Sequence, residues 1–186
     1  MDTESRAELD SAVVLITGVM AAGKSTVAQL LAERLPRAAH VRGDAFRRMV
    51  VAGREELLPE ATAEAAAQLD LRYRLSAMVA DEYARSGWTA VVQDIVLGPD
   101  LTEYVARVLT RPLYVVVLAP SPESVRSREA RRPKDGYGIW TVEALDRALR
   151  EETPRVGLWL DTSRQTPQET VTAILDRLPE ARVSAG

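Results

Sequence analysis

The sequence predicts a three-layer α/β fold, in which a five-stranded parallel sheet lies between layers of helices. Three observations support this prediction. Short apolar runs alternate with longer segments of helical periodicity, which is the pattern of a parallel sheet with helical crossovers. The run Thr89–Val92 is nearly all apolar, as expected of a central strand covered on both faces. A glycine-rich loop, Gly18–Thr26, stands between the first apolar run and the first helical segment.

Five apolar runs are expected to form the strands, because each is short and bounded by polar or turn-forming residues. In chain order they are Val13–Thr17, Ala39–Arg42, Thr89–Val92, Leu113–Leu118 and Val156–Leu160. Residues 1–11 are polar and are expected to be flexible. The chain contains no internal repeat, low-complexity tract or linker, so residues 1–186 are expected to form a single domain.

Helical signals mark seven segments: Thr26–Leu35, Ala45–Val51, Glu60–Ser86, Leu101–Leu109, Ser121–Arg131, Thr141–Glu151 and Thr166–Leu178. Pro36 stops the first helix. The third segment has neither glycine nor proline, so it forms one long helix or two joined end to end, and Gly87 ends it. Ser121, followed by Pro122, is a helix cap with proline in the first turn, and Thr141 is expected to cap the next helix.

The long segment 60–86 carries apolar residues whose spacing predicts packing against the core: Leu69, Leu71, Tyr73, Leu75, Met78, Val79 and Tyr83. Charged residues are interleaved with them. Asp70, Arg72 and Arg74 either face an acceptor pocket or lie at the surface, and the surface is the simpler expectation for each.

Composition excludes several classes of chemistry. The chain has no cysteine and one histidine, so disulfides, thiolate nucleophiles and multi-histidine metal sites are ruled out. His40 is expected to be structural. The net charge of −3 provides no general basic field, which disfavours nucleic acid as a partner. No apolar run approaches the length of a membrane span and no signal peptide is recognisable, so the expected location is the cytoplasm.

The loop after the first strand reads Gly-Val-Met-Ala-Ala-Gly-Lys-Ser-Thr, a full match to the phosphate-binding pattern G-x-x-x-x-G-K-S. Its glycines let the backbone wrap a phosphate, and the following helix directs its first N–H groups at the anion. Lys24 is expected to reach the β- and γ-phosphates, and the Ser25 hydroxyl to hold Mg²⁺. The sequence therefore predicts a P-loop NTPase fold. Its expected nucleotide-binding residues are Gly18, Ala21, Ala22, Gly23, Lys24, Ser25 and Thr26.

Two carboxylates follow strands whose ends should meet at the same edge of the sheet, where ligands of parallel α/β proteins bind. Asp44, after the second strand, is a candidate to accept a proton from an attacking hydroxyl; the alternative is a helix N-cap. Asp94, at the end of the third strand, is a candidate metal or substrate contact, and the alternative is a loop residue that caps the next helix. Asp100 is better placed for that capping role.

The densest basic cluster ends the helical segment that begins at Ser121. It contains Arg126, Arg128, Arg131, Arg132 and Lys134. Pro133 and Gly136 break the helix there, so an arginine-rich lid of about residues 126–140 is expected to close over a phosphoryl group. The alternative is a solvated helix end whose arginines favour the C-terminal dipole.

Together these features resemble the small P-loop kinases that include chloramphenicol phosphotransferase and, more loosely, gluconate kinase, shikimate kinase and zeta toxins. The resemblance rests on Gly18–Thr26, Asp44, the segment Asp94-Ile-Val-Leu-Gly98, the lid residues 128–138 and Leu160-Asp-Thr-Ser163, which together span nearly the whole chain.

The resemblance implies a role for each matched residue. Lys24 and Ser25 would bind phosphate and Mg²⁺, and Asp44 would take the acceptor proton. Arg131 or Arg132 would meet the transferred phosphate. Arginines at the start of the lid and the polar residues after the last strand would lie near adenine; these are Arg126, Arg128, Thr162 and Ser163.

The expected activity is therefore ATP-dependent transfer of the γ-phosphoryl group to a hydroxyl of a small molecule, such as an antibiotic, a sugar or a sugar acid. ATP and Mg²⁺ are the expected cofactors. Two alternatives stay open: a kinase for a nucleotide, nucleotide sugar or nucleic-acid end, and a regulatory module that hydrolyses nucleotide slowly. The sequence does not decide between ATP and GTP, between Asp44 and Asp94 as the base, or among oligomeric states.

Overall fold

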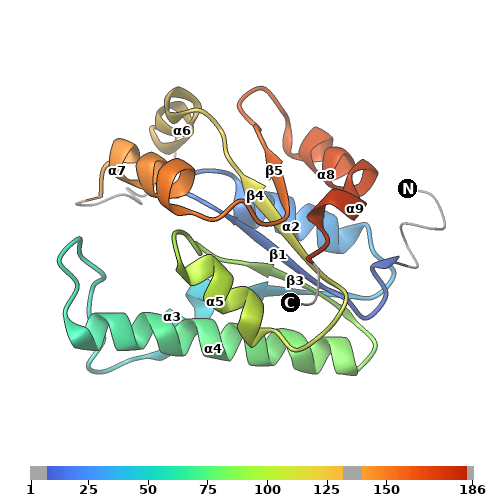
Figure 1. Ribbon diagram of the computed structural model, residues 1–186, viewed down its shortest axis with the longest axis horizontal. Helices are drawn as coiled ribbons and strands as arrows, with labels where there is room; N and C mark the ends of the chain where they lie inside the picture. The colour runs from blue at the N-terminus through green and yellow to red at the C-terminus, as the bar shows by residue number, and fades with distance from the viewer. Residues whose placement is uncertain (1–7, 132–139, 184–186) are drawn as a thin grey trace.

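Five parallel strands form the centre of the parts described by the computed structural model, residues 8–131 and 140–183 (Figure 1). The strands are β1 (Val13–Gly18), β2 (Ala38–Arg42), β3 (Thr89–Gln93), β4 (Leu113–Leu118) and β5 (Leu158–Leu160). Their spatial order is β2-β3-β1-β4-β5, and every neighbouring pair is parallel. The predicted five-stranded parallel sheet is confirmed.

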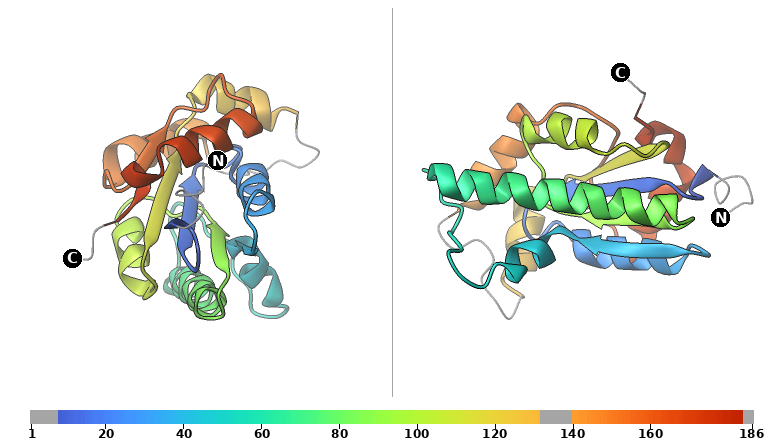
Figure 2. Two further views of the ribbon diagram at one scale, coloured as in Figure 1. Left: turned by 90° about the vertical axis from the view of Figure 1, so that its right-hand side faces the viewer. Right: turned by 90° about the horizontal axis from the view of Figure 1, so that it is seen from below.

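Helices lie on both faces of this sheet, as Figure 2 shows. On one side α4 and α5 pack together, and on the other side α2 packs against α8. The helices are α2 (Lys24–Glu33), α3 (Gly43–Met49), α4 (Ala63–Arg85), α5 (Asp100–Arg107), α6 (Pro122–Glu129), α7 (Val142–Arg147), α8 (Pro167–Asp176) and α9 (Leu178–Ala181), with a π-helical turn at Ala148–Glu152. None of the described helices is long and apolar enough to cross a membrane.

The core surrounds the central strands. Every residue of β1, β3 and β4 is buried, which explains why their sequences are continuous apolar runs rather than alternating ones. In β1, Val14 lies between Val91 of β3 and Tyr114 of β4. This rigid centre carries the loop after β1 and the ends of β2 and β3 at one edge of the sheet.

Most local helix signals are confirmed. The Ser121 side chain accepts a hydrogen bond from Ser124 N, and the Thr141 side chain accepts one from Ala144 N. Gly87 follows the end of α4 with φ 79°, the left-handed conformation expected of a glycine there. The long segment forms one continuous helix.

Two capping interpretations are wrong. Arg42, not Asp44, is the N-cap of α3, and Asp44 lies in the first turn. Asp100 also lies in the first turn of its helix, after Pro99, and its side chain makes no capping bond. Both carboxylates still lie where a helix dipole favours negative charge. The N-terminal residues 1–7 and most of the predicted lid, residues 132–139, lie outside the described residues.

The apolar residues of α4 do not share one face, in contrast to the expectation. Tyr73 is buried and Leu69 packs against the core. Leu71 and Met78 are exposed at 37% and 65%. Leu71 and Met78 share one face of the helix, because residues seven apart return to the same face. Their exposure shows that this is the outer face.

Candidate functional site

The loop between β1 and α2 depends on backbone conformations that few residues adopt. Gly18 has φ 142°, and a Cβ there would lie 2.4 Å from the carbonyl oxygen of Leu118. Ala21 and Gly23 also have positive φ, 58° and 98°, and Gly23 is the N-cap of α2. The loop therefore curls directly into the helix, whose N-terminal N–H groups face the space above the sheet edge.

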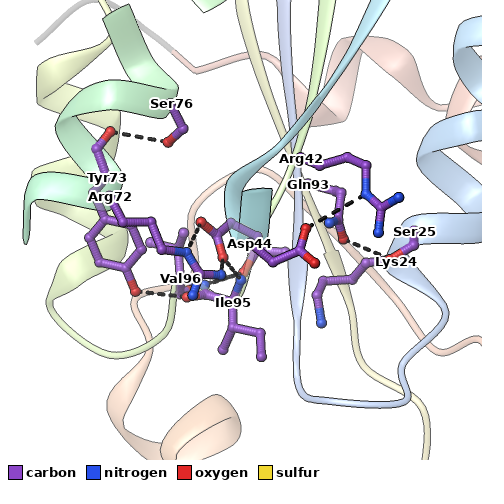
Figure 3. Close-up of polar contacts among 12 residues, drawn as sticks. Lys24, Ser25, Arg42, Asp44, Arg72, Tyr73, Ser76, Gln93, Ile95 and Val96 are labelled. Atoms are coloured by element: carbon purple, nitrogen blue, oxygen red, sulfur yellow. Dashed lines mark hydrogen bonds and ion pairs between the residues drawn. The ribbon is translucent and has the colours of Figure 1, made fainter. Parts of the chain in front are cut away.

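Lys24 and Ser25 begin α2 and connect the loop to neighbouring segments (Figure 3). The Lys24 side chain folds back over the loop, where Nζ donates a hydrogen bond to Val19 O at 2.7 Å. The Ser25 hydroxyl donates to Gln93 Oε1 at 3.0 Å, which joins α2 to the end of β3. Sequence reasoning assigned Gln93 no role; the contact with Ser25 places it at the loop.

A cavity of about 430 Å³ opens above the loop. It brings together residues from β2–α3, β3, α4, α6 and the β5–α8 connection. Predicted site residues in its lining are Ala21, Ala22, Gly23, Lys24, Ser25, Thr26, Asp44, Asp94, Arg128 and Thr162. Additional lining comes from Arg72, Gln93 and Gln165. Gly18, Arg126, Arg131 and Ser163 are described but do not line it, and Arg132 lies outside the described residues.

A buried ion pair forms one wall of the cavity. The Asp94 side chain is fully buried and that of Arg72 is 15% exposed. Arg72 Nε donates to Asp94 Oδ2 at 2.8 Å, and Nη2 pairs with the other oxygen, so the guanidinium grips the carboxylate with two bonds. Ile95 N also donates to Oδ1, at 2.7 Å. Burial lowers the pKa of the Arg72 guanidinium from its usual value.

The surface location expected for Arg72 is therefore wrong. Arg72 lies on the inner face of α4, beside Tyr73 and one turn from Ser76, both buried. The helical period contained this signal, because position 72 falls between the core positions 69 and 76. The ion pair occupies both oxygens of Asp94. The metal role of Asp94 stays a prediction, and this pairing weighs against direct coordination.

The segment after β3 is held from three sides. Tyr73 Oη donates to Ile95 O at 2.7 Å. Thr17 Oγ1 donates to Val96 O at 2.8 Å and accepts from Val96 N at 2.9 Å. With the Arg72–Asp94 pair, these bonds fix residues 94–96 between β1 and α4, so this wall of the cavity is preorganised.

Gly43 makes room for that wall. A Cβ at this position would lie 1.8 Å from Asp94 Oδ2. Gly43→Ala is therefore expected to destabilise the protein by about 1–3 kcal/mol, through overpacking against a buried ion pair. A loss of stability in this variant would support the close approach, because alanine normally stabilises a helix relative to glycine by up to about 1 kcal/mol. Chemical denaturation of both proteins measures the difference; a more stable alanine variant would contradict the close approach.

Asp44 faces the cavity from α3, beside the end of β2 (Figure 3). Its side chain is 37% exposed and forms ion pairs with Arg48 Nη1 at 2.8 Å and Arg42 Nε at 3.6 Å. Asp44 and Asp94 thus lie in different environments: one carboxylate is accessible from the cavity, whereas the other is enclosed by its partner.

Arg126 and Arg128 of α6 were both predicted to lie near adenine, but their side chains have different partners. Arg128 donates to Ala22 O at 3.1 Å and to Thr162 O at 2.5 Å, so it joins the loop after β1 to the segment after β5. Burial lowers the pKa of Arg128. Arg126 instead pairs with Glu143 at the surface. Thr162 Oγ1 is buried and has no hydrogen-bond partner within the described chain.

Asp161 and Ser163 form a local turn rather than part of the cavity wall. Ser163 donates to Asp161 through its hydroxyl and, at 2.9 Å, through its backbone N–H. These bonds hold the pKa of Asp161 below its usual value, and the Ser163 hydroxyl is the largest cause. Ser163 Oγ also accepts from Ser121 N at 2.8 Å. The polar segment thereby fixes the start of α6.

The sheet order and the loop together define a P-loop domain with the α/β fold of small kinases. Its sequence supports this assignment. Residues 13–154 match a family described as AAA domain, and the chain belongs to that family. No curated protein sequence matches the chain.

Solved structures show the same fold at low sequence identity. APS kinase of Mycobacterium tuberculosis, in complex with AMPPNP and APS, is 21% identical with a TM-score of 0.67, over 90% of this chain and 97% of that one. A sugar kinase from Janibacter sp. HTCC2649 is 20% identical with a TM-score of 0.63, over 91% and 95%. A gluconokinase from Sinorhizobium meliloti 1021 is 20% identical with a TM-score of 0.62, over 90% and 93%. The specific resemblance to chloramphenicol phosphotransferase is not among these findings.

Proposed function

We propose that this protein transfers the γ-phosphoryl group of ATP to a hydroxyl group of a small molecule. One observation carries the proposal: Lys24 and Ser25 of the phosphate-binding loop and Asp44 of α3 line the same cavity. This reaction needs a group that binds phosphate and a carboxylate that accepts a proton. The likeness of the fold to that of sugar, gluconate and APS kinases supports the reaction class.

The loop side of the cavity fits a nucleotide and its magnesium ion. The N-terminus of α2 and Lys24 supply positive charge for the phosphates. The Ser25 hydroxyl and Gln93 Oε1 are oxygen donors of the kind that Mg²⁺ binds. Within residues 8–131 and 140–183 no group of three acidic or histidine side chains is arranged to hold a metal, so nucleotide phosphates would complete the coordination. When bound, Mg²⁺ neutralises charge that develops on the phosphates.

Asp44 is the proposed proton acceptor. The acceptor oxygen attacks the γ-phosphorus in line with the leaving oxygen of ADP, the bond between that oxygen and phosphorus breaks, and the hydroxyl proton passes to Asp44. Lys24 holds the phosphates during transfer. Arg42 and Arg48 keep the Asp44 carboxylate in place at the cavity. The predicted lid arginines Arg131 and Arg132 would meet the transferred group on closure.

The test is ADP release from Mg-ATP across a panel of hydroxylated antibiotics, sugars, sugar acids and nucleosides. Strong stimulation by one compound, absent from the Lys24→Ala protein, identifies the acceptor class. Stimulation by a nucleoside only would replace the small-molecule assignment with the nucleotide-kinase alternative. Tight ATP binding with no response to any compound would favour the regulatory module.

Asp44→Asn is expected to leave ATP affinity nearly unchanged and to lower acceptor-dependent turnover about a hundredfold or more, the usual range for a positioned acid–base group. Steady-state kinetics with the acceptor from the panel measure it. Asp70→Asn serves as the matched control, because Asp70 is another arginine-paired aspartate and lies on α4 outside the cavity. Turnover that survives in Asp44→Asn but is lost in Asp94→Asn would assign the base to Asp94.

A further inference from the structure

Arg72 lines the cavity but has no part in the proposed phosphoryl transfer. It lies on α4, in the wall that the segment after β3 completes. Its partner Asp94 has no exposed side-chain surface, whereas 15% of the Arg72 side chain is exposed. Of the two paired side chains, only that of Arg72 is therefore accessible to a ligand in the cavity.

The Arg72 guanidinium keeps one edge available for hydrogen bonding. Nε donates to Asp94 Oδ2 at 2.8 Å and Nη2 pairs with Oδ1, which uses two of the five N–H groups of an arginine. In residues 8–131 and 140–183, Nη1 has no hydrogen-bond acceptor, and it does not belong to the buried polar atoms that lack a partner. One N–H of Nη1 and one of Nη2 thus remain in parallel, the arrangement that binds a carboxylate with two bonds.

The charges beside the cavity favour an anionic ligand. Asp44 pairs with both Arg42 and Arg48, and Asp94 pairs with Arg72. Among these described ion pairs two carboxylates face three guanidinium groups, which leaves an excess of positive charge. A ligand that carries a negative charge complements this excess better than a neutral one does.

Arg72 lies within electrostatic range of the proposed proton acceptor. Burial has the largest effect on the pKa of Arg72 and lowers it, whereas the Asp44 carboxylate acts in the opposite direction and raises it. Both side chains line the same cavity (Figure 3). One small molecule can therefore place an anionic group at Arg72 and a hydroxyl group at Asp44.

We propose that Arg72 binds a carboxylate of the phosphoryl acceptor, so that the acceptor is a hydroxy acid rather than a neutral alcohol. The available edge of the guanidinium holds this carboxylate with two charge-assisted hydrogen bonds. Asp94 is a positioning residue, because its bonds to Arg72 and to Ile95 N fix the direction of that edge. The inference rests on the proposed function for the role of the ligand as acceptor.

Calorimetric titration of the full chain, with Mg²⁺ and a non-hydrolysable ATP analogue bound, tests the preference for acids. The probes are matched pairs that differ in the acidic group: D-gluconate with D-glucitol, D-glucuronate with D-glucose, and D-glycerate with glycerol. At least one acid is expected to bind about tenfold or more tightly than its neutral counterpart, as hydrogen bonds to a charged group allow. Equal affinities within every pair, or no binding of any acid, would overturn the inference.

The double variant Arg72→Met/Asp94→Asn assigns the preference to Arg72, because it removes the guanidinium without leaving a buried carboxylate charge. It is expected to bind the acid no more tightly than the neutral counterpart. Asp94→Asn alone keeps the guanidinium and is expected to keep the preference. Arg74→Met is the matched control, since Arg74 is another aspartate-paired arginine of α4 but does not line the cavity.

Circular dichroism confirms that each variant is folded. A preference for acids that survives in the double variant would exclude Arg72 as the carboxylate site. So would a preference that Asp94→Asn or Arg74→Met abolishes as fully as the double variant does.

ADP release from Mg-ATP separates this inference from the proposed reaction. Acid binding that depends on Arg72, without ADP release, would support the carboxylate site and overturn the phosphoryl transfer. ADP release that only neutral alcohols stimulate would support the transfer and overturn the preference for a hydroxy acid.

Discussion

Lys24→Ala is expected to lower kcat/KM for phosphoryl transfer about a thousandfold, because it removes the cation that offsets charge on the transferring group. Lys24 is 8% exposed and lies at the start of α2, and the loop Gly18–Thr26 contains no other lysine or arginine that could replace it. The ammonium acts most strongly in the transition state. The loss should therefore appear mainly in kcat, with a smaller effect on ATP affinity.

Kinetics and calorimetric ATP titration together measure both effects. Arg34→Ala is the control: Arg34 is an exposed cation immediately after α2, at the opposite end from the loop, and its loss should leave both constants near the parent values. Lys24→Arg is expected to restore little activity, because the larger, planar guanidinium does not fit the position of a nearly buried ammonium. Turnover within threefold of the parent in Lys24→Ala would place the chemistry elsewhere.

Arg72→Met is expected to destabilise the protein by about 3–5 kcal/mol, because it leaves the fully buried Asp94 carboxylate without its partner. Urea denaturation followed by circular dichroism measures this loss. The control is Arg74→Met on the same helix. Arg74 also pairs with an aspartate, but its side chain is 56% exposed, so its removal should cost less than about 1 kcal/mol.

The double variant Arg72→Met/Asp94→Asn separates charge from packing. If the buried charge causes the loss, neutralising Asp94 should recover much of the stability, and the coupling between the two positions should exceed about 1 kcal/mol. Equal losses in Arg72→Met and Arg74→Met would show that the buried pair contributes no more than a surface pair does.

Local sequence patterns predicted much of this protein. The strand Leu113–Leu118 has the predicted bounds, and the Ser121 and Thr141 caps form as expected. Each depends on a few neighbouring residues: apolar runs make buried strands, and a hydroxyl before a helix satisfies an N–H group of its first turn. The phosphate-binding loop is of the same kind, because its glycines and the helix after it are adjacent in the chain.

The pairing of distant residues was not predictable in this way. Arg72 was expected at the surface, yet it pairs with Asp94, 22 residues away. Arg126 and Arg128 are equivalent in the sequence, but only Arg128 reaches Ala22 and Thr162. Which arginine makes these contacts depends on the direction of each side chain from α6. It also depends on which segments the sheet order places beside that helix.

By itself the sequence determined the fold class and the position of the glycine-rich loop, since these follow from periodicity and backbone conformation within short segments. Only the tertiary structure decided that Asp44 is accessible and Asp94 enclosed, because each environment is built from several elements. The order β2-β3-β1-β4-β5 places the ends of β2 and β3 beside α4, and that proximity gives Asp94 its buried arginine. The tertiary structure also decided which apolar residues of α4 face outward, because a helix buries only the side that its neighbours cover.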